Sequence, residues 1–223
     1  MQIDSNSFLN GSNLDVKGTP PLVAPKDSLK NSCIFTEAKK KQNLNQNVPE
    51  VKNAKLAQDP LSTQAQTQAN TVEESNKIAL QYIKNLQKDF GLTKKQAVGI
   101  TANLWHESAG MNAGINQGGV VGEPDPNMDD DNKHGYGIAQ WGGVRKQGLL
   151  DYAKKNGIPA SSDAANYGYL KQELKGKYND VIKAVKKTDS IYAATAVFEN
   201  KFEHATEPNL DSRLAVADKL MEL

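Results

Sequence analysis

The chain has 223 residues, with 27 lysines and arginines against 26 aspartates and glutamates. Such a balance excludes both a nucleic-acid-binding protein with a broad basic face and a protein with an acidic tail. The single cysteine, Cys33, excludes an intrachain disulfide, and no run approaches the ~18 apolar residues that a membrane span needs.

Residues 1–70 are typical of an extended arm. Their apolar residues are scattered without helical or strand period, and a stretch rich in Gln, Asn and Thr runs from Gln42 to Asn70. Too little apolar surface is available there to offset the entropy of an ordered chain, so we expect disorder over 1–70. The pairs Phe8-Leu9 and Ile34-Phe35 could anchor this arm on a partner, which makes it a possible docking segment.

The ordered domain is predicted to begin at Thr71 and to continue to the last residue, 223. Thr71 and Glu74 have the spacing of a capping box, in which each residue bonds the backbone of the other. Apolar residues then recur at helical spacing as far as Phe90, and Gly91 provides a left-handed stop. Thr93 and Gln96 repeat the capping pattern and open a second helix, which ends near Glu107.

The segment 109–141 is predicted to be a small β-hairpin lobe, because glycines and prolines interrupt any helical run. Short strands are expected at 119–121 and 136–140. Helices then return, over 144–156, 162–176, 178–187, 190–202 and 210–223. The sequence therefore predicts an α+β fold, mostly α, with a small hairpin lobe and a long N-terminal arm.

Glu107 is the candidate catalytic residue. Cleaving a glycosidic bond requires a proton for the leaving oxygen, and a carboxylic acid supplies it when its pKa is raised. Glu107 continues the apolar face of Ala97, Ile100 and Leu104, so burial should raise its pKa. The negative end of the helix dipole acts in the same direction. A glutamate that ends a helix is also often a plain surface residue.

The segment 134–141, His-Gly-Tyr-Gly-Ile-Ala-Gln-Trp, offers a wall for a sugar chain. Glycines such as Gly137 allow a ligand to approach the backbone closely. The amide of Gln140 can both donate to and accept from sugar groups. Tyr136 or Trp141 could stack on a sugar ring, although Trp141 is more typical of a core residue than Tyr136 is.

These motifs resemble the phage tail lysozyme family, within the lysozyme and lytic transglycosylase superfamily. The resemblance rests on Glu107-Ser108, the segment 135–141 and Arg145, and it covers about residues 75–220. Shorter motifs before and after them also fit, at residues 99–104, 172–174, 193–198, Phe202-Glu203 and Arg213. It implies a lysozyme-like fold and cleavage of peptidoglycan between N-acetylmuramic acid and N-acetylglucosamine. It also implies Glu107 as general acid and Ser108 beside it among the substrate-binding residues.

The second catalytic group is left open by the sequence. A hydrolase uses a second acid to activate water or to act as nucleophile. The acidic insert offers Glu123, Asp129 and Asp131 as candidates, with Asp125 and Asp130 beside them. Lytic transglycosylases work with one acid and form an anhydro sugar. We expect a hydrolase, with a transglycosylase as the alternative.

No cofactor and no metal are expected. A zinc protease motif fails because Gly110 stands where a second histidine is needed. A calcium loop starting at Asp125 fails because Asp130 and Tyr136 occupy the positions of its glycine and its final glutamate.

The expected partner is the peptidoglycan glycan strand, with phage tail or injection-machine proteins bound through the arm. The first residues lack the positive flank and apolar run of a secretory signal. We therefore expect a component of a virion tail, or a protein delivered to the periplasm by an injection apparatus. The alternatives are an injected antibacterial effector and a structural module of a tail that binds glycan without cleaving it.

Overall fold

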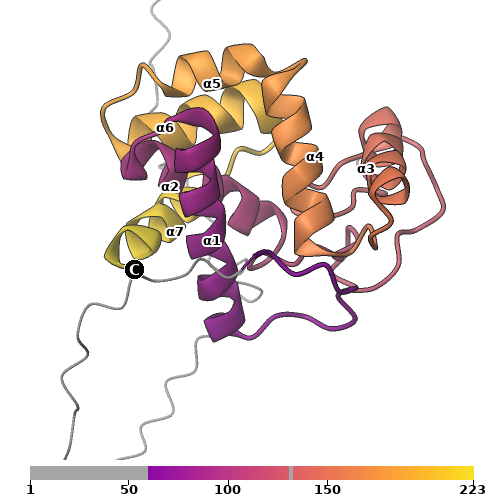
Figure 1. Cartoon of the computed structure of the whole chain (residues 1–223). Coiled ribbons are helices and arrows are strands. Elements are labelled where there is room, and N and C mark those ends of the chain that lie inside the picture. Colours follow the sequence, from indigo (N-terminus) through magenta and orange to yellow (C-terminus); the bar gives the residue numbers. More distant parts are fainter. Residues whose placement is uncertain (1–59, 131–132) are drawn as a thin grey trace, which may run out of the picture. The chain divides into compact units, whose positions relative to one another are not determined.

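A computed structural model describes residues 60–130 and 133–223, and within them the chain is mostly helical (Figure 1). None of the helices in this part of the chain is long and apolar enough to cross a membrane. The elements are α1 (Val72–Phe90), α2 (Lys94–Glu107), α3 (Gly143–Asn156), α4 (Asp163–Lys175), α5 (Asn179–Val185), α6 (Ile191–Phe198), the π-helix η1 (Glu199–Glu203) and α7 (Leu210–Glu222). The prediction of a mostly helical fold is confirmed.

Both predicted capping boxes are confirmed. The hydroxyl of Thr71 accepts from the backbone N–H of Glu74, and the Glu74 carboxylate accepts from the backbone N–H of Thr71. Thr93 and Gln96 bond in the same reciprocal way at the start of α2. Each box satisfies two N–H groups that have no partner within the helix, and so sets where that helix begins.

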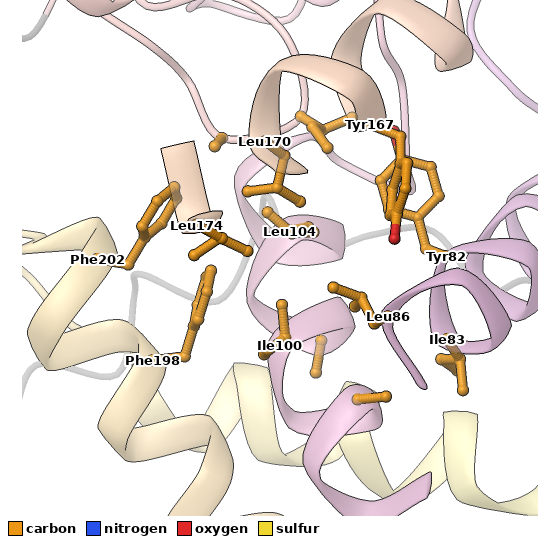
Figure 2. Packing of buried hydrophobic residues seen from close by; sticks show 14 of the residues in the cluster. Tyr82, Ile83, Leu86, Ile100, Leu104, Tyr167, Leu170, Leu174, Phe198 and Phe202 are labelled. Atoms are coloured by element: carbon orange, nitrogen blue, oxygen red, sulfur yellow. The ribbon is translucent and has the colours of Figure 1, made fainter. Parts of the chain in front are cut away.

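Helix α2 is the central element and packs against α1, α6 and α7. The sequence predicted one buried face, but every residue from Gln96 to Leu104 is buried. Figure 2 shows Ile100 and Leu104 among apolar side chains that come from α1, α4, α6 and η1. A helix enclosed in this way holds its C-terminal residue, Glu107, in a fixed position.

Gly99 allows α2 and α6 to approach closely. A Cβ atom at this position would lie 2.6 Å from Cβ of Ala194 and 2.7 Å from the backbone nitrogen of Thr195. Neither atom can move without shifting α6, so we expect Gly99→Ala to lower the free energy of unfolding by about 2 kcal/mol. Gly168→Ala in α4 is the matched control, because there the contact is the hydroxyl end of half-buried Tyr152. Thermal unfolding of both variants checks this, and equal midpoints would contradict it.

The predicted hairpin lobe lacks regular strands in the described part of the chain. Between Ala109 and Gly142 the backbone forms the isolated antiparallel bridges Ile115–Val121, Asn116–Tyr136 and Tyr136–Trp141. Left-handed backbone at Gly118, Gly119 and Gly137 turns the chain too often for a longer ladder. The segments 119–121 and 136–140, predicted as strands, are therefore turns and bridges.

Residues 60–70 pack against the helical body, although the sequence placed them in the disordered arm. The side chain of Gln66 bonds Asn70, Asn112 and the backbone N–H of Gly114. Asn70 in turn bonds the carbonyl oxygens of Gly110 and Met111. The rest of the predicted arm, residues 1–59 with its two apolar pairs, lies outside the described residues.

Asp163, at the start of α4, lies beside this segment, because the N–H of Ala164 donates to the carbonyl of Ser62. Burial raises the pKa of Asp163 to about 7, against about 3.9 for an exposed aspartate. The folded state therefore binds the proton more tightly, and this contribution to stability is lost as pH rises from about 4 to about 7. We expect Asp163→Asn to raise the melting temperature at pH 8 but not at pH 4. Asp180→Asn, which removes an exposed acid from the first turn of α5, should show no such pH dependence.

Candidate active site

A groove with a volume of about 460 Å³ lies at the C-terminal end of α2. Glu107 lines it, together with residues of the acidic insert, the segment after it and the end of η1. The full lining comprises Glu107, Gln117, Asp129, Asp130, His134, Gly135, Ala139, Gln140, Gly142, Arg145, Phe202, Glu203, His204, Ala205 and Thr206. The side chain predicted from sequence as the catalytic acid therefore opens onto the groove.

Glu107 is held by a buried arginine of α7. Nη2 of Arg213 donates to Oε1 of Glu107 at 2.5 Å, and the exposed fractions of the two side chains are 1% and 18%. Nη1 of Arg213 donates to Oδ1 of Asn103, and Nε donates to the carbonyl of Pro208. The sequence predicted apolar surroundings for Glu107. The structure adds the guanidinium of Arg213, which stabilises the charged carboxylate.

Glu203 brings a second glutamate into the same groove. It is the last residue of η1, and its Oε1 is buried with no hydrogen-bond partner among the described residues. Burial raises the pKa of Glu203 well above its ordinary value, and the negative charge of Glu107 raises it further, against the opposing charges of Arg145 and Arg213. The groove thus contains one carboxylate paired with arginine and one carboxyl group that favours its protonated form.

Arg145 lines the groove and is held in place by Glu173, which also bonds Trp141. Its guanidinium donates to both carboxylate oxygens of Glu173, at 2.8 and 3.0 Å, and lies 4.5 Å from the ring centre of Phe202. Nε1 of Trp141 donates to the same carboxylate at 2.8 Å. This arginine was part of the sequence motif, and its structural role is to tie α3 to α4 beneath the site.

Of the residues predicted to bind sugar, Gln140 is the one that lines the groove. Ser108, Tyr136 and Trp141 are fully buried, and their polar atoms bond Leu104, Gly122 and Glu173 respectively. Because these atoms already have protein partners, the three residues support the groove wall from behind.

Gly137 is also buried, so the atoms that approach its backbone closely belong to the protein and not to a ligand as predicted. A Cβ atom there would lie 2.5 Å from Oδ1 of Asn166 and 3.1 Å from the Trp141 ring. Gly137 therefore permits close packing of the wall on α4.

The candidates for the second carboxylate differ in whether they line the groove. Asp129 lines the groove, as does its neighbour Asp130. Glu123 is exposed and does not line the groove. Asp131 lies outside the described residues.

The acidic insert is organised around the buried ammonium of Lys146. Its Nζ donates to the carbonyl oxygens of Asp125, Asn127 and His134 at 2.6, 3.0 and 3.1 Å. A positive charge therefore sits at the centre of the loop whose spacing resembled the start of a calcium site. His134 bonds Asp125 and Asn127 across the same loop, so these described residues of the loop are held together beside the groove.

Removing the ammonium should loosen this loop. We expect Lys146→Met to lower the free energy of unfolding by roughly 3 kcal/mol, because three carbonyl groups lose a charged donor. The matched control is Lys154→Met, which removes an exposed lysine from the same helix and should change stability little. Urea unfolding of both variants gives the comparison, and equal losses would show that the loop does not depend on Lys146.

The sequence motifs included Glu203 and Arg213, but the sequence assigned neither residue a role in the site. Arg213 is separated from Glu107 by 106 positions, and Glu203 lies in a π-helix that helical periodicity cannot indicate. The available signal was that both residues belong to the motifs on which the resemblance rests.

Comparison with known protein families identifies the family to which this chain belongs. A model of the phage tail lysozyme family matches residues 77–223, which include α2, the groove and α7. A comparison with curated proteins finds no match. The family match covers more than half of the chain and contains every groove residue named above. The chain therefore belongs to the phage tail lysozyme family, and its general activity is lysozyme-like degradation of peptidoglycan.

Proposed function

We propose that this chain is a glycoside hydrolase that cleaves the β-1,4 bond between N-acetylmuramic acid and N-acetylglucosamine, with Glu107 as the general acid. The observation that carries the proposal is the position of Glu107, on the wall of the groove and at the end of a helix whose residues 96–104 are all buried. A rigid support of this kind keeps a proton donor in a fixed place relative to a bound substrate.

The lining of the groove suits a polar polymer. Gln117 and Gln140 line the groove, and Oε1 of Gln140 can accept from hydroxyl and N-acetyl groups while its Nε2 donates to the carbonyls of Ile115 and Gly137. Its volume of about 460 Å³ lies within the range of about 300–1,000 Å³ typical of ligand sites. More than one carboxylic acid lines it, as hydrolysis requires.

The proposed setting is a phage tail, or a tail-like apparatus that opens the cell wall locally. The family match supports this setting, and the predicted arm would supply the attachment. Detection of the protein in purified particles would support it, whereas its absence from them would favour an injected effector.

Analysis of the products tests the reaction. Purified peptidoglycan sacculi are incubated with the protein, and the released fragments are identified by mass spectrometry. We expect fragments that end in reducing N-acetylmuramic acid. Fragments that end in the 1,6-anhydro sugar would show a lytic transglycosylase instead. Binding to sacculi without release would contradict both reactions and show a glycan-binding module.

A further inference from the structure

Glu203 is held at the groove by the geometry of η1. Phe202, immediately before it, is buried and stacks on Phe198 with ring centres 4.7 Å apart. His204, immediately after it, has a left-handed backbone, and its N–H donates to the carbonyl of Glu199. These two neighbours fix where Glu203 lies. Short π-helical turns of this kind occur frequently at functional sites.

The positive charges near Glu203 are engaged with other acceptors. Arg145 donates to both oxygens of Glu173, and Arg213 donates to Glu107, Asn103 and Pro208. Oε1 of Glu203 has no hydrogen-bond partner in the described part of the chain. A buried carboxylate oxygen without a partner is costly when charged, so the neutral acid is the favoured form.

We propose that Glu203 is the second acidic group of the reaction and that it shares a single proton with Glu107. The proposal rests on the proposed function of the groove, because it assigns the proton to the same cleavage. It also rests on two independent features: both glutamates line one groove, and only Glu107 has an arginine partner. Two coupled carboxyl groups titrate as a pair, with one proton retained between them over a range of pH.

The reaction then balances around the pair. As the bond between C1 and the glycosidic oxygen breaks, the shared proton moves to that oxygen. The oxygen of a water molecule next bonds C1, and a proton of this water returns to the pair, which ends with the one proton it started with. If the C6 hydroxyl attacks in place of water, its proton returns in the same way. The proposal therefore holds for either type of product.

The charged groups around the pair raise or lower the pKa of Glu203. Burial is the main cause of the raised pKa of Glu203, the charge of Glu107 is the next, and Glu173 acts in the same direction. Arg145 and Arg213 lower this pKa. The other titratable groups that line the groove are Asp129, Asp130, His134 and His204.

Titration of the carboxyl groups tests the pair without reference to activity. The side-chain carboxyl carbons of glutamate are labelled with ¹³C, and their chemical shifts are followed against pH in the wild-type chain, E107Q and E203Q. We expect a glutamate signal with a raised midpoint that is absent in E203Q. In E107Q the midpoint of this signal should fall by about one pH unit or more, because the neighbouring charge is gone. An unchanged midpoint in E107Q would overturn the pair.

The pH–rate profile then tests the catalytic role. We expect Glu203→Gln to lower kcat about 10²-fold, the lower end of acid–base effects, and to move the high-pH limb of the profile down by about one unit. The matched control is Glu207→Gln, an exposed residue outside the groove, which should keep the wild-type profile. A wild-type profile in E203Q would overturn the role of Glu203. A wild-type chain that releases no fragments would instead refute the proposed function, and the titration would still decide whether the pair exists.

Discussion

Replacing Glu107 with glutamine is expected to lower the rate of fragment release from sacculi about 10³-fold, within the range that a general acid supplies. The glutamine keeps the size of the side chain and can still accept a hydrogen bond from Arg213 through its carbonyl oxygen. The fold should therefore survive, because the enclosed helix α2 depends on its packing against α1, α6 and α7. The rate is measured as soluble fragment released per enzyme at saturating substrate.

Two controls separate lost chemistry from lost structure. E107Q should stay folded and bind sacculi like the wild-type chain, although its melting temperature should fall because buried Arg213 loses its charged partner. Glu73→Gln, an exposed acid at the start of α1, should leave the rate unchanged. Substantial fragment release by a folded E107Q would show that the general acid is another residue.

Replacing Arg213 with methionine is expected to produce the largest loss of stability, about 3–4 kcal/mol, because one partner of a buried ion pair is removed. Arg213 is 1% exposed and joins α7 to α2 through Glu107 and Asn103. The loss should appear in the free energy of unfolding measured with urea. Arg213→Lys should recover only part of it, since an ammonium lacks the planar fork of the guanidinium.

A double-mutant cycle identifies the cause of this loss. If the charge of Glu107 without its partner is the main cost, the variant R213M/E107Q should be more stable than R213M alone. Strict additivity of the two single changes would mean that the contacts of Arg213 with Asn103 and Pro208 carry its effect.

The helices could be predicted because their signals are local. The capping boxes at Thr71 and Thr93 and the left-handed stop at Gly91 depend on residues at most four positions apart. The packing of residues 60–70 could not be predicted in this way. Its bonds come from the amides of Gln66 and Asn70 to residues more than 40 positions away, and a stretch rich in Gln and Asn has the composition of a linker.

The site was predictable at Glu107 and less so around it. Helix phase placed Glu107 at the end of α2, where it does line the groove. Tyr136 and Trp141 have the composition of a sugar-binding wall, yet their polar atoms satisfy buried partners across the fold. Glu203 reaches the groove through tertiary contact alone. The acidic residues of the insert were the stronger local signal for a second carboxylate.

A structure of the E107Q variant with a bound peptidoglycan tetrasaccharide tests the central claim most directly. We expect the glycan to lie along the groove lined by residues 107, 140 and 203, with a glycosidic oxygen about 3 Å from the side chain of residue 107. A second hollow of about 320 Å³ lies between residues 60–66 and α1, on Gln66, Asn70 and Lys77. A glycan bound there, or bound in the groove with every glycosidic oxygen far from residue 107, would contradict the account.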